Sequence, residues 1–246
     1  LETTGGKTWE AAHVLADYLE EEWPSLGAGP GARLLELGSG TGWLGMTVAR
    51  NVPGLGEVLL SEQAAGGAVE WLEHNVERNR AQALPLGSVR VAELDWARWD
   101  DQPPGGSAGA PDAEDATRTS KGPWDLVLGS DLIYSACGAR RFLRVLCAIL
   151  GDEAESPWRG MLYAHTLHRF DFLDVDFFRD LRQLGLDYRL VAWPESEGEA
   201  PPGDPLVGDG FLEELFPDQR IAVFQVLPAG AAQGRWLPPA RPLPGG

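Results

Sequence analysis

Three glycines spaced two apart, Gly38, Gly40 and Gly42, are the residues best suited to hold a ligand, and they lie in the segment "RLLELGSGTGWLG". Such a loop lets backbone amides and a helix N-terminus approach a ligand closely, because no Cβ stands in the way. Glu36 precedes the loop. Glu62 follows it by about 20 residues, a place from which a carboxylate accepts hydrogen bonds from ribose hydroxyls. We therefore expect these five residues to bind an adenosine compound.

Two adenosine cofactors fit this loop, a dinucleotide and S-adenosylmethionine. Gly40, Gly42 and Gly45 satisfy the G-x-G-x-x-G pattern of dinucleotide sites, but the first glycine after the apolar run is Gly38. The carboxylate of Glu36 would repel a pyrophosphate, whereas it suits a sulfonium or an ammonium. The loop alone favours the methyl donor. A dinucleotide and a tight turn without a ligand remain alternatives.

The elements that must position this loop alternate along the chain. Short apolar runs predict buried strands, and apolar residues at three- and four-residue spacings predict amphipathic helices. This alternation is typical of a doubly wound α/β domain with a mostly parallel sheet, in which ligands bind beyond the carboxyl ends of the strands. The last strand follows without a full crossover helix, so we expect it to run antiparallel. The predicted strands are 32–37, 57–62, 88–96, 124–134 with its loop, 159–166, 187–193 and 220–226, and the helices are 8–23, 42–52, 68–79, 139–150 and 174–184.

Two segments fall outside this pattern. Residues 100–123 are rich in Pro, Gly, Ala and Asp and have no periodicity, which predicts a flexible surface insertion. Residues 228–246 have a similar composition and predict a disordered tail. We expect a single domain over residues 1–227, with a linker at 194–219 that holds a candidate short helix at 210–216.

Composition excludes several classes of protein. The 246 residues are 43% hydrophobic, enough for a sizeable core. The formal charge of −17 repels phosphate backbones and anionic membranes, so we expect no nucleic-acid or membrane partner and allow a basic protein partner. No run approaches the roughly 20 apolar residues of a membrane helix. The start carries no secretory pattern, although the chain begins at Leu1, as a trimmed or partial sequence would.

The cysteines and histidines indicate neither disulfides nor a metal site. Cys137 and Cys147 are too few for a secreted disulfide framework, which favours a reduced, cytoplasmic protein, with the nucleus as a further location. The four histidines lack metal-ligand spacing, so no metal is expected. His165 and His168 lie at the end of the fifth predicted strand, where a surface or packing role is the more frequent one and a substrate contact the alternative.

Three further segments accompany the glycine loop, namely "GGKTWEAAHVLADYLE" (5–20), "ELDW" (93–96) and "GSDLIY" (129–134). In this order and spacing, from about residue 5 to 150, the chain resembles the seven-β-strand protein-lysine methyltransferases of the methyltransferase family 16 type, which carry a D-x-x-Y motif. The resemblance implies a Rossmann-like seven-stranded sheet, S-adenosylmethionine as donor and S-adenosylhomocysteine as product. It also implies an exposed lysine of an intracellular chaperone, ATPase or translation factor as acceptor.

The resemblance assigns cofactor contacts residue by residue. Gly38, Ser39 and Gly40 would contact the methionine part of the cofactor. Glu62 would bind the ribose, where relatives more often have Asp.

The remaining contacts come from later segments and from the N-terminal helix. Asp95 and Trp96 would contact the adenine, one at its edge and the other at its face. Trp9 would close over the cofactor, and Ser130, where relatives often have Ala, would lie next to the donor.

Asp131 and Tyr134 begin and end the D-x-x-Y motif. Methyl transfer from a sulfonium is an in-line displacement, and the attacking lysine must be neutral although its ordinary pKa is about 10.4. A nearby carboxylate raises the pKa of an amine, so we expect Asp131 to position the incoming ammonium, with deprotonation through water. Tyr134 would supply a wall and a hydroxyl acceptor, and most of the rate would come from alignment of the two reactants.

We expect the chain to be a monomer. Two other functions remain open from the sequence. One is methylation of a small-molecule amine or a protein N-terminus. The other is a module that binds the cofactor without turnover and acts through its acidic surface.

Overall fold

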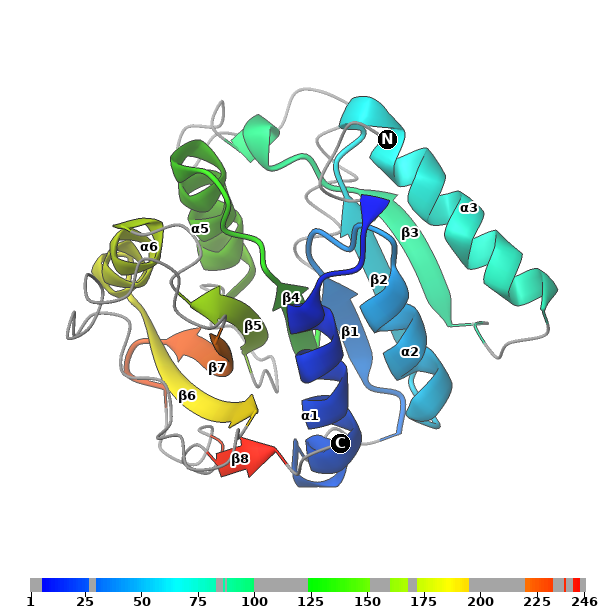
Figure 1. The fold of residues 1–246 in the computed structure, drawn as a ribbon, viewed down its shortest axis with the longest axis horizontal. Helices are drawn as coiled ribbons and strands as arrows, with labels where there is room; N and C mark the ends of the chain where they lie inside the picture. Colours follow the sequence, from blue (N-terminus) through cyan, green and yellow to red (C-terminus); the bar gives the residue numbers. More distant parts are fainter. Residues whose placement is uncertain are drawn as a thin grey trace.

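One eight-stranded sheet with helices on both faces forms the centre of the fold (Figure 1). The computed structural model describes residues 6–26, 30–82, 86, 88–99, 124–150, 160–167, 172–194, 220–231, 237 and 241–243. The helices are α1 (Glu10–Leu26), α2 (Trp43–Asn51), α3 (Ala68–Ala81), α5 (Ala136–Leu150) and α6 (Phe172–Gln183), with short 3-10 turns η2 (Ala65–Gly67) and η3 (Trp96–Trp99). The strands are β1 (Arg33–Glu36), β2 (Glu57–Glu62), β3 (Val89–Glu93), β4 (Leu126–Ser130), β5 (Met161–Leu167), β6 (Leu186–Pro194), β7 (Arg220–Pro228) and β8 (Arg241–Leu243).

The strand order is β3-β2-β1-β4-β5-β7-β6-β8. Strand β7 pairs antiparallel with both β5 and β6, and the other pairs are parallel. The predicted doubly wound, mostly parallel sheet and its antiparallel strand at 220–226 are therefore confirmed. The chain builds outward from β1 to β3 and then returns to add β4 on the other side of β1. Ligands in such sheets bind at this reversal, beyond the carboxyl ends of the strands.

Successive residues of each strand point to opposite faces of the sheet and so build two hydrophobic cores. Leu34 of β1 packs with α1, α2 and α3 on one face, and its neighbour Leu35 packs with α5 and α6 on the other. Figure 1 shows α1 lying across the middle of the sheet beside α2. Because both faces are covered, the central strands read as continuous apolar runs rather than as alternating ones.

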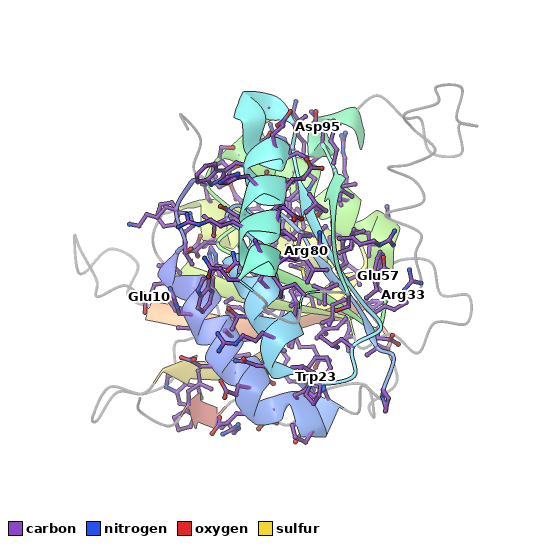
Figure 2. The ribbon with its side chains drawn as sticks, turned by 90° about the vertical axis from the view of Figure 1, so that its right-hand side faces the viewer. Glu10, Trp23, Arg33, Glu57, Arg80 and Asp95 are labelled. Atoms are coloured by element: carbon purple, nitrogen blue, oxygen red, sulfur yellow. The ribbon has the colours of Figure 1, made fainter. Side chains whose placement is uncertain are left out.

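An ion pair marks the amino end of the sheet. Arg33 and Glu57 begin β1 and β2, face each other in the register, and join Nη2 to Oε2 at 2.7 Å. Figure 2 shows this pair at one end of the sheet and Asp95, which follows β3, at the other. The residues that follow β1, β2, β3 and β4 are therefore brought together at the end of the sheet marked by Asp95.

The sheet has eight strands rather than the predicted seven. Strand β8 lies in the segment predicted to be a disordered tail, and it pairs in parallel with β6, with Arg241 opposite Ala192. The prediction is wrong at this strand because Leu243 is buried in the core that α1 helps to form. The predicted insertion at 100–123 and the candidate helix at 210–216 lie outside the described residues.

Candidate active site

A cavity of about 260 Å³ lies where the glycine loop after β1, the turn after β3 and the loop after β4 meet. The segment before α1 forms a further wall through Lys7, Thr8 and Trp9. With the exception of Gly42, every residue predicted for the site lines this cavity. These residues are Trp9, Glu36, Gly38, Ser39, Gly40, Glu62, Asp95, Trp96, Ser130, Asp131 and Tyr134.

The glycine loop needs glycine for both conformation and space. Gly38, Gly40 and Gly42 have φ angles of 59°, 54° and 76°, in the left-handed region that L-residues with a side chain avoid. A Cβ on Gly38 would lie 2.6 Å from Cδ2 of Leu132, in the loop after β4. Gly42 is the N-cap residue of α2. A Cβ there would lie 2.5 Å from Cδ1 of Leu72, so Gly42 serves the turn and the packing of α3 rather than the cavity wall.

Glu36 is buried at the end of β1, and its Oε2 accepts a hydrogen bond of 3.0 Å from the Gly45 amide. Burial raises the pKa of Glu36 to about 8, against the opposing effect of that amide. At neutral pH the carboxyl group is therefore largely protonated, so its repulsion of a pyrophosphate is weaker than the sequence suggests. A Cβ on Gly45 would lie 2.6 Å from this oxygen and 2.2 Å from Cδ2 of Leu60. Close packing of α2 on the sheet thus accounts for Gly45, which completes the apparent dinucleotide pattern.

Glu62 and Ser39 connect the glycine loop to β2. Glu62 accepts hydrogen bonds of 2.9 Å from the Gly40 amide at Oε2 and from the Gln63 amide at Oε1. Burial raises the pKa of Glu62. The Ser39 hydroxyl accepts a 3.1 Å hydrogen bond from the Ser61 amide and donates to the Glu36 carbonyl at 3.3 Å. Both side chains therefore hold the loop as well as line the cavity.

Two aromatic residues border the cavity from different segments. Trp96 is half-buried in η3, and its ring centroid lies 5.2 Å from that of Phe142 on α5. Asp95 caps this short helix, because its Oδ1 accepts a 2.9 Å hydrogen bond from the Ala97 amide. Trp9 stands before α1, with Nζ of Lys7 at 5.2 Å from its ring centroid. A planar group inside the cavity would therefore find an indole ring that is already fixed by packing on α5.

The loop after β4 carries the D-x-x-Y motif in an unusual backbone conformation. Asp131, with a φ of 49°, is the one non-glycine residue of the described ranges in the left-handed region. Its Oδ1 accepts from the Thr166 amide at 2.8 Å, and its Oδ2 accepts from the Thr166 hydroxyl at 2.9 Å. Tyr134, at the other end of the motif, is 43% exposed at the rim. The structure thus ties Asp131 to β5 and leaves Tyr134 to face solvent.

Neither a metal cluster nor a membrane-spanning helix occurs among the described residues. In that part of the chain, no cluster of three or more His, Cys, Asp or Glu side chains is arranged to hold a metal ion. Among the same residues, no helix combines the length and the apolar character that crossing a membrane demands.

The strand order, the antiparallel β7 and the cavity at the carboxyl ends of the strands define a Rossmann-like methyltransferase fold. PH1948 of Pyrococcus horikoshii, described as a candidate RNA methyltransferase, shares this fold with a TM-score of 0.52 and 14% identity, over 95% of this chain and 90% of that one. The lysine methyltransferase family model matches residues 1–183, and the chain belongs to that family. The resemblance inferred from the four sequence segments is confirmed.

Two relatives illustrate the similarity in sequence. EEF1A lysine methyltransferase 3 of Mus musculus is 30% identical over 175 residues, which cover 71% of this chain and 61% of the relative. Protein N-lysine methyltransferase METTL21A of Danio rerio is 32% identical over 126 residues, 51% of this chain and 46% of the relative. The chain therefore spans less than two thirds of the length of either relative.

Proposed function

We propose that the chain is an S-adenosylmethionine-dependent protein-lysine N-methyltransferase. The observation that carries this proposal is that the glycine loop and the D-x-x-Y loop line the same cavity. Leu132 of the second loop packs so closely on Gly38 of the first that a Cβ there would lie 2.6 Å from its Cδ2. A donor held by one loop would thus have its reactive end next to an acceptor held by the other.

The residues around the cavity fit such a donor. The half-buried ring of Trp96 offers a face to adenine, and Asp95 stands beside it for the base edge. Glu62 would bind the ribose, and the loop from Gly38 through Ser39 to Gly40 would hold the methionine part. When bound, the donor supplies an electrophilic methyl group on a sulfonium.

Trp9 would cover the cofactor, and Ser130 would lie beside its reactive end; both line the cavity. With its pKa raised to about 8, Glu36 can lose its proton near neutral pH. A positively charged ligand in the cavity would favour that loss, because a nearby cation lowers the pKa of a carboxyl group.

Asp131 and Tyr134 would act on the acceptor. Tyr134 stands at the exposed rim, where its ring would guide a lysine side chain inward. The carboxylate of Asp131 would attract the ammonium form and hold the loop through Thr166, while the proton leaves to water. The chain would then accelerate transfer chiefly by aligning the amine with the methyl group.

Labelled donor, incubated with the chain and a cell extract, tests the proposal. We expect a labelled protein band that yields methyl-lysine on hydrolysis. Since the mouse relative is named for EEF1A, that protein is the first purified substrate to test. Label found only in arginine, nucleic acid or small molecules would contradict the proposal. Donor binding without release of S-adenosylhomocysteine would favour the non-catalytic module instead.

A matched pair of variants supplies the control. Gly38→Ala places a side chain at a φ of 59° and against Leu132, so it should abolish labelling. Gly31→Ala imposes the same kind of backbone strain at a φ of 87° but meets nothing within 4 Å, and Gly31 does not line the cavity. Labelling should therefore survive Gly31→Ala. Equal loss in both variants would show that strain, and not the cavity, explains the effect.

A further inference from the structure

Three buried side chains lie in a row beneath the D-x-x-Y loop. Tyr163 and His165 belong to β5, Asp174 belongs to α6, and none is more than 1% exposed. His165 Nε2 lies 2.9 Å from Oδ1 of Asp174, and His165 Nδ1 lies 3.2 Å from the Tyr163 hydroxyl oxygen. That oxygen accepts a 3.2 Å hydrogen bond from the amide of Leu132, the second residue of the motif. A continuous chain of hydrogen bonds thus connects α6 to the loop.

The chemistry of these groups limits the directions of the hydrogen bonds. The carboxylate of Asp174 only accepts, so His165 carries a proton on Nε2. Nδ1 of His165 faces the Tyr163 hydroxyl oxygen at 3.2 Å and Oδ1 of Asp131 at 4.0 Å. Burial raises the pKa of Tyr163 well above its ordinary value, so the phenol keeps its proton. The lone pairs of the Tyr163 hydroxyl oxygen are available to accept the hydrogen bond from the Leu132 amide.

Packing alone does not call for these polar atoms. The Tyr163 and His165 rings stack with centroids 5.4 Å apart, and Phe178 contacts His165 edge-on at 5.9 Å. Phenylalanine would fill such an aromatic cluster equally well, whereas buried polar groups cost free energy unless each finds a partner. We therefore attribute the polar atoms of this row to their hydrogen bonds, which end at the backbone amide of Leu132 in the motif.

The loop requires such support because its backbone is strained. The left-handed conformation of Asp131 costs free energy for a residue with a Cβ, although Asp and Asn tolerate it better than most, and contacts with the surroundings stabilise it. Strand β5 enforces it from three points: the Ala164 carbonyl accepts from the Asp131 amide at 3.0 Å, Thr166 binds the carboxylate, and Tyr163 binds Leu132. Leu132 in turn packs on Gly38, so its position sets the spacing between the two loops.

We propose that Tyr163, His165 and Asp174 are positioning residues that hold the D-x-x-Y loop against the glycine loop, an inference that rests on the proposed methyl transfer. They touch neither reactant. Their effect reaches the acceptor through Leu132 and the backbone of the motif, and also through His165, whose Nδ1 lies 4.0 Å from Oδ1 of Asp131.

Tyr163→Phe tests this relay, because it removes one oxygen and keeps the ring. We expect kcat for methyl transfer to fall about tenfold, the effect of losing one hydrogen bond that aligns the reactants. The KM for donor and the affinity for S-adenosylhomocysteine should stay within about twofold, since the glycine loop is unchanged. Hydrogen exchange at the Leu132 amide should accelerate, because its acceptor is gone.

Tyr188→Phe is the matched control. Tyr188 lies in the same aromatic cluster, with ring centroids 4.6 Å from Phe178 and 5.9 Å from Phe224, but on β6, which β5 and β7 separate from β4. The kcat of Tyr188→Phe and the rate of hydrogen exchange at its Leu132 amide should equal those of the parent. An equal loss in both variants would overturn the relay, because it would assign the effect to the cluster as a whole.

Asp174→Asn tests the far end of the row. Combined with Tyr163→Phe, it should reduce kcat no further than the more damaging single change does, as expected for members of one chain of hydrogen bonds. Additive losses would overturn the relay. If Asp174→Asn does not fold, the comparison of Tyr163→Phe with Tyr188→Phe decides the matter.

The exchange measurement separates this inference from the proposed function. Unchanged Leu132 exchange in Tyr163→Phe overturns the relay whatever happens to kcat. If the parent transfers no methyl group, the proposed function fails, and faster Leu132 exchange still supports the relay as the support of this loop.

Discussion

At the scale of single residues, Glu36 makes stability depend on pH. Its pKa is raised by burial to about 8, while in the unfolded chain a glutamate titrates near its ordinary value of about 4.3. Between these values the folded chain binds the extra proton, so the free energy of unfolding falls as pH rises from about 4.5 to about 8. Glu36→Gln cannot ionise and keeps an acceptor oxygen for Gly45. We expect it to melt more than about 3 °C above the parent at pH 8, and the two to converge at pH 5.

Circular dichroism melts at the two pH values measure this difference. Glu73→Gln, a change at an exposed position on α3, is the control and should differ from the parent equally at pH 5 and pH 8. A gain for Glu36→Gln that is the same at both values would contradict the explanation by burial.

Asp131 holds the loop through Thr166 and has a proposed role toward the acceptor, and different substitutions should separate the two. Asp131→Ala leaves the Thr166 amide and hydroxyl without their acceptors, and alanine disfavours a φ of 49°. Asparagine tolerates that conformation and still accepts one of the two bonds. We expect Asp131→Ala to lower kcat at least about a hundredfold, through misplacement of the acceptor, and to melt well below Asp131→Asn. Affinity for S-adenosylhomocysteine, measured by calorimetry, should change little in both variants. Loss of that affinity would show that Asp131 supports the donor instead.

The strand pattern predicted that the glycine loop, Glu36 and Glu62 lie at one edge of the sheet, because parallel strands bring their carboxyl ends together, and the other cavity residues came from the family resemblance. It did not predict which atoms those residues contact. The partnership of Asp131 with Thr166 spans 35 residues and depends on the register of β4 against β5, which no local pattern encodes. For the same reason, the sequence left a surface or packing role for His165 open and did not predict its burial against Asp174 and Tyr163.

At the scale of elements, the alternation of apolar runs with helical patterns was sufficient to predict seven strands but did not predict β8. That strand has three residues and lies in a segment whose prolines favour irregular structure. Proline lacks an amide donor and is tolerated at the edge of a sheet, which is where Pro242 lies. Leu243 of β8 is buried, and so is Leu237, whose amide donates a 2.8 Å hydrogen bond to Oε1 of buried Gln225. Composition alone does not reveal such long-range burial.

The attachment of β8 to the fold should depend on burial more than on charge. Leu243 is 7% exposed, so Leu243→Ala should lower the free energy of unfolding by about 2 kcal/mol. Arg241 pairs with Glu22 and, at 2.9 Å, with Glu21 of α1, but its side chain is 39% exposed. Exposed pairs contribute little, so Arg241→Ala should cost less than about 1 kcal/mol. Urea denaturation measures both values, and a larger cost for Arg241→Ala would mean that the ion pairs hold the strand.

At the scale of the whole molecule, charge determines which partners the chain attracts. The 37 acidic residues outnumber the 20 basic ones, for a formal charge of −17. Such a field raises the encounter rate with basic proteins and lowers it with polyanions. The proposed donor would bind inside the cavity through short-range contacts. Salt should therefore affect the two proposed reactants differently.

Raising the salt concentration from about 0.1 M to about 0.5 M shortens the range over which exposed charges act. We expect the KM for a basic protein substrate to rise at least about threefold over this range, and the KM for the donor to stay nearly constant. A peptide of zero net charge that carries the same lysine is the control, because its encounter with the chain owes nothing to the molecular charge. Its KM should not respond to salt. If the protein and the neutral peptide respond alike, recognition lies in contacts around the lysine, and the acidic surface plays no part in selecting the substrate.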